Sequence, residues 1–217
     1  MKDLTVIFLT LNKVPDKWAQ YHKEVLFKAI GDADLITISK EPMRFGKNLI
    51  QEEEPSVNNI YRQILRGAKE ATTKYIAIAE DDVLYPPDHF EYRPESGVFA
   101  YNGHRWGLHT WGEPVFYHKP RISNATLIAE RDLVVNSLTE RFTKYPNNQI
   151  GELGKEKGTQ LNRYETKRFW SKNGVVYFSH VFAIDHLEQQ QRKRAGVVQA
   201  YEIPYWGRSY ELVEKFK

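Results

Sequence analysis

The segment TKYIAIAEDDVLYPPDHF, residues 73–90, decides how this chain is expected to fold. Residues 75–79 form a short run of apolar, β-compatible side chains, which is typical of a buried parallel strand. Glu80, Asp81 and Asp82 follow directly. Adjacent carboxylates repel one another and cost desolvation, so they indicate either a bound cation or a turn with solvated acids. The C-terminal ends of strands are where open α/β sheets bind ligands.

The residues before this segment predict a parallel crossover unit. LTVIFLTL, residues 4–11, reads as a first buried strand, and Pro15 begins a helix that Gly31 ends. DLITIS, residues 34–39, is a second strand. Residues 40–55 read as a loop, and a helix with an apolar stripe follows at 57–71. This β-α-β-loop-α-β order is that of a mononucleotide-binding half-sheet.

After Pro86 and Pro87 the pattern becomes irregular. Short strands separated by Gly and Pro are expected within residues 97–107, 114–120 and 124–130, and a helix at about 130–142. Residues 145–174 show no period and are interpreted as a long loop region, which in a compact domain is typically functional or disordered. VVYFSHVFAIDHL, residues 175–187, is the last expected strand, and Trp206 in the tail is expected to pack back.

Composition favours one folded domain. The chain has 217 residues, of which 41% are hydrophobic and 13% aromatic, enough for a proper core. The absence of cysteine excludes disulfides, thiolate metal sites and cysteine nucleophiles. We expect no membrane partner, because no apolar run approaches a membrane span, and a cytoplasmic location, because the N-terminal residues lack a signal-peptide pattern.

The charge is unevenly distributed along the chain. Residues 1–110 carry 14 Lys/Arg and 16 Asp/Glu, and residues 111–217 carry the remaining 17 and 12. A basic second half is compatible with an anionic partner, although a solvated basic surface explains the same excess. The chain also lacks both common glycine-rich phosphate loops, which argues against a P-loop ATPase or a dinucleotide oxidoreductase. A divalent metal on strand-end carboxylates is the alternative way to hold phosphates.

The strand ending near Thr10 and the motif YIAIAEDDVLY together resemble the nucleotide-sugar half of a GT-A glycosyltransferase. AEDDVLYPPDHF followed by FAYNGHRWG is similar to small stand-alone glycosyltransferases common in bacteriophage and environmental genomes. The resemblance implies a single α/β domain over residues 1–217, with a mostly parallel central sheet and helices on both faces. Residues 1–90 would form the nucleotide-sugar-binding half and 91–217 an irregular acceptor half. If the protein is phage-encoded, its cytoplasmic location is that of the host.

The resemblance also implies a metal site for Mn²⁺ or Mg²⁺. Asp82 is the expected direct ligand, and Glu80 the other acid of the motif, contacting the donor ribose or a metal-bound water. Asp81 occupies the middle position, which the family leaves variable. His180 is expected as a late-strand ligand, with His186 as the substitute if the strand register differs. For His180 alone, a half-buried structural histidine is the competing interpretation.

The donor is expected to be a nucleotide sugar, with a UDP-sugar first. Thr10, Leu11 and Asn12 lie where this fold meets the nucleoside, and Asn58 and Arg62 are candidates for pyrimidine and phosphate contacts. Plain solvation of a helix face is the alternative for the last two.

Catalytic and acceptor residues follow from the same resemblance. Glu152, in a glycine-flanked loop, and Asp185 are candidate bases, which an inverting enzyme needs near the acceptor hydroxyl. The candidate acceptor residues form an aromatic and basic cluster of Tyr101, Arg105, Trp106 and Trp111. With QRKR at 191–194, this cluster makes a hydroxymethylated pyrimidine in phage DNA one candidate acceptor; a glycan or a small molecule is the other.

Two further function classes compete with a metal-dependent glycosyltransferase. A nucleotidyltransferase on a related half-sheet is expected to carry a glycine-rich basic loop after the first strand, and TLNKVPDKW lacks the glycines. A non-catalytic nucleotide-sugar or nucleic-acid binding module would bind the donor with manganese without turnover. The oligomeric state is not indicated by the sequence.

Overall fold

The computed structural model describes residues 1–146, 164–181, 183 and 198–217. These residues form a seven-stranded sheet in the order β10-β6-β9-β4-β1-β2-β3. Adjacent strands pair in parallel except at β9, which is antiparallel to both of its neighbours. The strands are β1 (Leu4–Leu9), β2 (Asp34–Ser39), β3 (Lys47–Ile50), β4 (Tyr75–Glu80), β6 (Val98–Asn102), β9 (Leu127–Glu130) and β10 (Glu165–Phe169).

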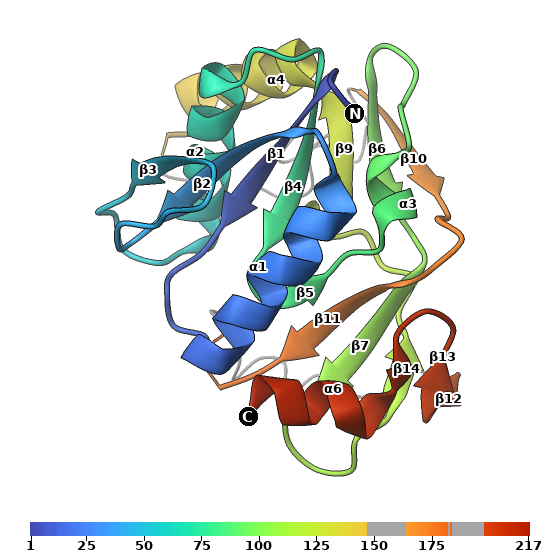
Figure 1. Ribbon diagram of the computed structural model, residues 1–217. Coiled ribbons are helices and arrows are strands. Elements are labelled where there is room, and N and C mark those ends of the chain that lie inside the picture. The colour runs from blue at the N-terminus through green and yellow to red at the C-terminus, as the bar shows by residue number, and fades with distance from the viewer. Residues whose placement is uncertain (147–163, 182, 184–197) are drawn as a thin grey trace.

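Helices cover both faces of this sheet because side chains alternate along its central strands. On β1, Leu4, Val6 and Phe8 face one core and Ile7 faces the other. The first core is closed by α1 (Asp16–Ile30), which lies in front of the sheet in Figure 1. The second is closed by α2 (Val57–Glu70) and α4 (Arg131–Lys144). The predicted α/β class, with a mostly parallel central sheet and helices on both faces, is confirmed.

A second sheet lies below the first in Figure 1, in the order β12-β8-β7-β11-β5. Its strands are β5 (Val83–Leu84), β7 (Arg105–His109), β8 (Phe116–His118), β11 (Val175–Ser179) and β12 (Gln199–Ala200). The chain passes from the first sheet into the second at three places: from β4 to β5, from β6 to β7 and from β10 to β11. The acidic cluster at residues 80–82 occupies the first of these crossings.

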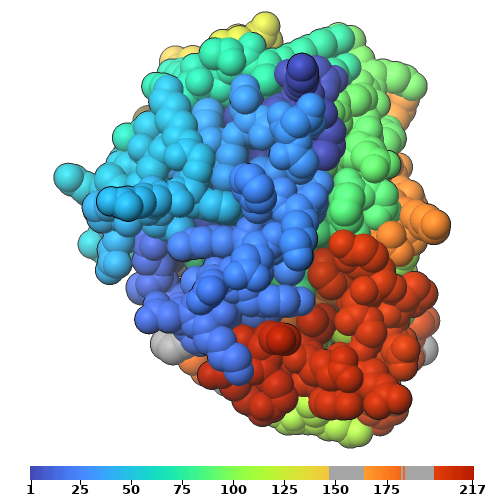
Figure 2. Space-filling view, viewed as in Figure 1, coloured from blue at the N-terminus to red at the C-terminus, as the bar shows by residue number. Residues whose placement is uncertain are grey.

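A third core lies between the second sheet, α1 and the C-terminal residues. The C-terminal residues form β13 (Glu202–Ile203), β14 (Gly207–Arg208) and α6 (Ser209–Phe216). The rings of Trp18 and Phe216 lie 4.9 Å apart, and the Trp206 indole N–H donates to the Gly174 carbonyl at 2.6 Å. Figure 2 shows this segment, in red, packed against the blue N-terminal residues. The smaller remaining elements are α3 (Pro87–Phe90) and a 3₁₀ turn, η1 (Asn124–Thr126).

The structure corrects three sequence expectations. The expected loop at 40–55 contains β3, and the expected loop at 145–174 contains β10. Both are edge strands of the first sheet, and both carry charged side chains, as edges that avoid further pairing do. The last expected strand, 175–187, ends at Ser179, and the tail forms strands and a helix. In the described part of the chain, every helix is too short or too polar to span a bilayer.

Candidate functional site

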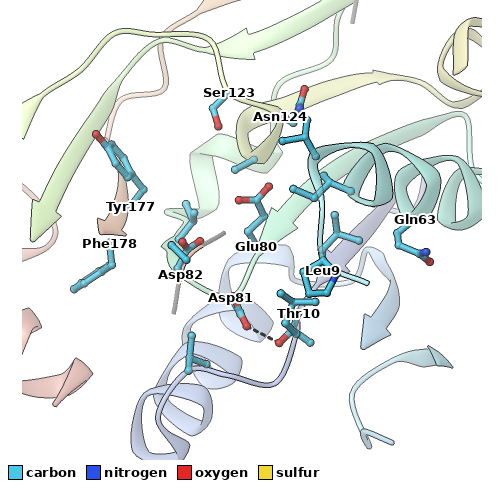
Figure 3. Close-up of a pocket in the computed structure, with 18 of the residues that line it drawn as sticks. Leu9, Thr10, Gln63, Glu80, Asp81, Asp82, Ser123, Asn124, Tyr177 and Phe178 are labelled. Carbon is cyan, nitrogen blue, oxygen red and sulfur yellow. Dashed lines mark hydrogen bonds between the residues drawn. The ribbon is translucent and has the colours of Figure 1, made fainter. Parts of the chain in front are cut away.

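A cavity of about 520 Å³ opens between the two sheets, beyond the C-terminal ends of β1 and β4. It has three parts. One end, called the nucleoside end because a nucleoside is expected there from the sequence, is lined by Leu9, Thr10, Leu11, Ile38 and the first turns of α2. The acidic cluster is Glu80, Asp81 and Asp82. The basic side is Arg105, Lys119 and Arg121 together with Tyr177. Figure 3 shows Glu80 and Asp82 between Tyr177 on one side and Leu9 and Gln63 on the other.

The main chain of the acidic cluster is held in place by hydrogen bonds with buried side chains. The backbone N–H of Glu80 donates to the Tyr85 hydroxyl at 3.0 Å, and that hydroxyl donates to the Ala125 carbonyl at 2.9 Å. The indole N–H of Trp18 donates to the Asp81 carbonyl at 2.7 Å. Because buried Trp18 and Tyr85 use their only polar groups here, the turn after β4 is fixed by side chains from α1 and from the chain beyond β5.

Asp81 points into the protein toward Thr10. The Thr10 hydroxyl donates to Asp81 Oδ2 at 2.5 Å, the dashed contact in Figure 3. Burial raises the pKa of Asp81 to about 7, and the neighbouring charge of Asp82 acts in the same direction. Asp81 therefore ties the end of β1 to the end of β4.

Asp82 and His180 lie next to each other in the cavity lining, with His180 Nε2 3.4 Å from Asp82 Oδ2. They meet because β5 pairs with β11 and because the Phe178 N–H donates to the Asp82 carbonyl at 2.8 Å. The His180 side chain is buried and comes from the residue directly after β11. The predicted late-strand histidine thus lies beside the predicted acid.

This pair offers one imidazole nitrogen and one carboxylate oxygen, a donor set that Mn²⁺ and Mg²⁺ accept. Among the residues that the structure describes, no three His, Asp or Glu side chains are arranged as a complete metal site. The pair would therefore hold a divalent ion only together with ligands from outside the protein, and does not form an all-protein cage. His186 and Asp185 lie outside the described residues.

The first strand's predicted residues divide into two roles. Thr10 and Leu11 line the cavity. Asn12 does not; its backbone is left-handed, with φ 57°, and its Oδ1 accepts from the backbone N–H groups of Lys40 and Glu41 at 2.9 and 3.0 Å. Asn12 joins the loops after β1 and β2 and so shapes the nucleoside end from outside.

On α2, the predicted residues lie outside the cavity and their neighbours line it. The guanidinium of Arg62 stacks 4.5 Å from the Phe142 ring and donates to the Pro146 carbonyl at 2.9 Å. Asn58 is also absent from the lining, which instead includes buried Asn59 and Gln63. The signal that identifies these two is their spacing of four residues on the buried face of the helix.

Of the four candidate acceptor residues, only Arg105 lines the cavity. Tyr101 is fully buried in the core between the first sheet and α4. The Trp106 ring packs 5.1 Å from His118, and Trp111 packs 4.8 Å from His109. Lys119, Arg121 and Tyr177 were missed because their approach to Arg105 depends on how β7, β8 and β11 pair. Glu152 and residues 191–194 lie outside the described residues.

Comparisons with known proteins give weak fold-level similarities. No protein-family model and no curated protein matches the chain. A glycosyltransferase involved in the glycosylation of the major capsid of PBCV-1 is similar over 87% of this chain and 97% of its own, with a TM-score of 0.48 and 12% identity.

Two further solved structures are similar at lower coverage of their own chains. S. aureus TarS 1–349, in complex with UDP-GlcNAc, is similar over 84% of this chain and 60% of its own, with a TM-score of 0.47 and 12% identity. The bifunctional IspDF from Campylobacter jejuni is similar over 79% of this chain and 50% of its own, with a TM-score of 0.40 and 6% identity. Because all three TM-scores lie below 0.5, the functional assignment rests on the geometry of the cavity.

Proposed function

We propose that this chain is a metal-dependent glycosyltransferase that moves a sugar from a nucleotide-sugar donor to an acceptor hydroxyl. The observation that carries the proposal is the cavity itself. It joins an apolar-walled nucleoside end, a carboxylate–imidazole pair and a basic side in one space at the strand ends. The first two parts are the surroundings that a nucleoside and a metal-bound diphosphate require, in that order.

In this proposal the donor's base and ribose occupy the nucleoside end, between Leu9, Thr10 and the first turns of α2. A UDP-sugar is the donor we expect first. Asp82 and His180 hold Mn²⁺ or Mg²⁺, and when bound that ion neutralises the charge that develops on the departing diphosphate. Glu80, which also lines the cavity, accepts hydrogen bonds from the ribose or from water in this proposal.

The reaction forms a bond between the acceptor oxygen and the anomeric carbon of the sugar. The bond from that carbon to the diphosphate oxygen breaks, and the nucleoside diphosphate leaves with the electron pair. The acceptor's proton passes to a base, for which Glu152 and Asp185 remain the sequence-based candidates. His180 is buried and Asp82 is partly buried, which limits the access of water to the donor side and strengthens their electrostatic interaction with the diphosphate.

A screen of nucleotide sugars tests the donor assignment without knowledge of the acceptor. We expect a UDP-sugar with Mn²⁺ to raise the melting temperature, because a ligand that binds only the folded state stabilises it. Slow hydrolysis of the bound UDP-sugar, which releases UDP, should accompany binding. If no nucleotide sugar changes the melting temperature with or without metal, the proposal is wrong. Binding without any release or transfer would favour a non-catalytic module instead.

The acceptor is a separate question with its own experiment. A hydroxymethylated pyrimidine in phage DNA is the first sequence-based candidate, and a glycan or a small molecule is the alternative. Filter binding of modified and unmodified duplex at several salt concentrations separates them. A DNA acceptor predicts a log–log salt slope of about −0.9 for each phosphate neutralised. Changing Arg192, Lys193 and Arg194 to Ala should flatten that slope, whereas a glycan acceptor predicts little duplex binding at physiological salt.

A further inference from the structure

The basic side of the cavity lies across the acidic cluster from the nucleoside end. Arg105 follows the crossing from β6 to β7, and Lys119 and Arg121 follow β8. The main chain fixes them together: the Lys119 N–H donates to the Arg105 carbonyl at 2.9 Å, and the Arg121 N–H donates to the Lys119 carbonyl at 2.7 Å. In Figure 3 their neighbour Tyr177 lies on the far side of Asp82 from Thr10.

Arg105 is a buried cation with too few partners. Its side chain is 8% exposed, its Nη1 donates to the Arg121 carbonyl, and its Nε has no hydrogen-bond partner within the described residues. No carboxylate in the described part of the chain lies within ion-pair distance of it. Burial lowers the pKa of Arg105, although Tyr177 and the carboxylate of Glu80 oppose this. A guanidinium in such a place normally has a counter-anion, because burying an unpaired charge is costly.

A second cation approaches the same place. The Arg105 guanidinium carbon lies 4.9 Å from the centre of the Tyr177 ring, and Lys119 Nζ lies 5.5 Å from it. The ring face attracts both cations, but the two positive charges also repel each other. An anion held between them would relieve that repulsion and supply acceptors for the unused Arg105 donors.

We infer that Arg105, Lys119 and Arg121 form a second anion subsite, which binds a phosphate or carboxylate group of the acceptor. The inference rests on the proposed function, because the donor diphosphate is assigned to Asp82 and His180 at the other side of the acidic cluster. The acceptor is then an acidic molecule whose reacting hydroxyl lies near its anionic group, and neutral glycans are poor substrates. The subsite holds that hydroxyl in place and takes no part in proton transfer.

Small anions test the subsite in the full-length protein. Methyl phosphate and acetate are titrated by calorimetry into protein saturated with UDP and Mg²⁺, with methanol as the neutral probe. We expect at least one anion to bind and methanol not to bind. Arg121→Gln should weaken anion binding by about tenfold, the loss expected for one charge-assisted hydrogen bond, while UDP affinity stays unchanged. Arg44→Gln, which changes an exposed arginine outside the cavity, is the matched control.

Each outcome decides the inference. It is overturned if neither anion binds the UDP-saturated protein, or if Arg121→Gln and Arg105→Gln weaken UDP as much as the small anion, because the basic side would then hold the donor diphosphate. Arg105→Gln is used only where its melting temperature shows a folded protein, and exposed Arg121 keeps the test valid otherwise. If UDP itself fails to bind, the donor assignment fails, and titration of the nucleotide-free protein still reports on the subsite.

Discussion

The imidazole of His180 and the carboxylate of Asp82 lie 3.4 Å apart, although they come from distant parts of the chain. The antiparallel pairing of β5 with β11 brings their main chains together, and the Phe178 N–H holds the Asp82 carbonyl. The pair therefore forms only when the second sheet is assembled. Its geometry couples the proposed donor site to the fold of the second half of the chain.

Replacing Asp82 by Asn should abolish metal-dependent donor binding and leave the fold intact. The amide keeps the size of the side chain, and the bond from Phe178 to the main chain of residue 82 is unaffected, but the negative charge that attracts a divalent ion is lost. Calorimetry with a UDP-sugar, with and without Mn²⁺, measures the effect. Asp132→Asn, at an exposed acid on α4, is the control. Full manganese-dependent activity in Asp82→Asn would show that the metal is assigned to the wrong residue.

His180→Ala should weaken metal-supported turnover by at least about tenfold, with partial rescue at high Mn²⁺, because a lost ligand lowers affinity that concentration can offset. The manganese dependence of initial rates measures this. The alternative is a packing role, since the His180 ring lies 5.1 Å from that of Phe216. A large fall in melting temperature with unchanged specific activity and manganese dependence would identify that role.

In the first sheet, the strands that could be predicted from sequence are those whose side chains are buried on both faces. β1, β2 and β4 are almost continuous apolar runs, and that pattern alone indicates a parallel strand between two helix layers. β3 and β10 could not be recognised, because an edge strand carries lysine, arginine and glutamate that are also typical of loops.

The candidate site divides in the same way. Asp82 and His180 come just after the C-terminal ends of predicted strands, so the positions of those strand ends were enough to place both residues near a ligand. Gln63 depends on the rotation of α2 about its axis, and Arg121 on the pairing of β7 with β8. Neither quantity can be read from a local pattern, because a helix turned by one position exposes a different set of side chains.

Gly67→Ala should destabilise the protein although alanine is the better helix former. A Cβ at this position of α2 would meet Ile7 Cγ2 on β1 at 2.7 Å. Helix propensity favours alanine by about 1 kcal/mol, but overpacking a buried contact costs roughly 1–3 kcal/mol. We expect a net loss of about 1 kcal/mol in urea unfolding. In an Ile7→Ala background the contact is absent, so Gly67→Ala should become neutral or stabilising there. Equal effects in both backgrounds would contradict the steric explanation.

The stability of the metal-free protein should fall from pH 6.5 to pH 4.5. Burial lowers the pKa of His22 to about 4 and of His89 to about 3. As the pH falls from 6.5 to 4.5, the unfolded chain therefore binds two protons that the folded chain does not bind. Asp81 acts in the opposite direction: its pKa, raised to about 7, lets the folded chain hold one proton that the unfolded chain releases. Two histidines against one carboxyl leave one proton in favour of the unfolded state, and burial of His118, which lowers its pKa too, acts in the same direction.

That balance predicts a slope of at least about 1.4 kcal/mol per pH unit, with stability lost as pH falls. Urea unfolding at several pH values in the presence of a chelator measures it. Asp81→Asn removes the opposing carboxyl and should steepen the slope by about 1.4 kcal/mol per pH unit, whereas His22→Gln should flatten it by about the same amount even if it lowers stability throughout. A slope unchanged in both variants would mean that other groups dominate the titration. Because the slope and not the absolute stability is compared, general damage from a buried substitution does not imitate the expected result.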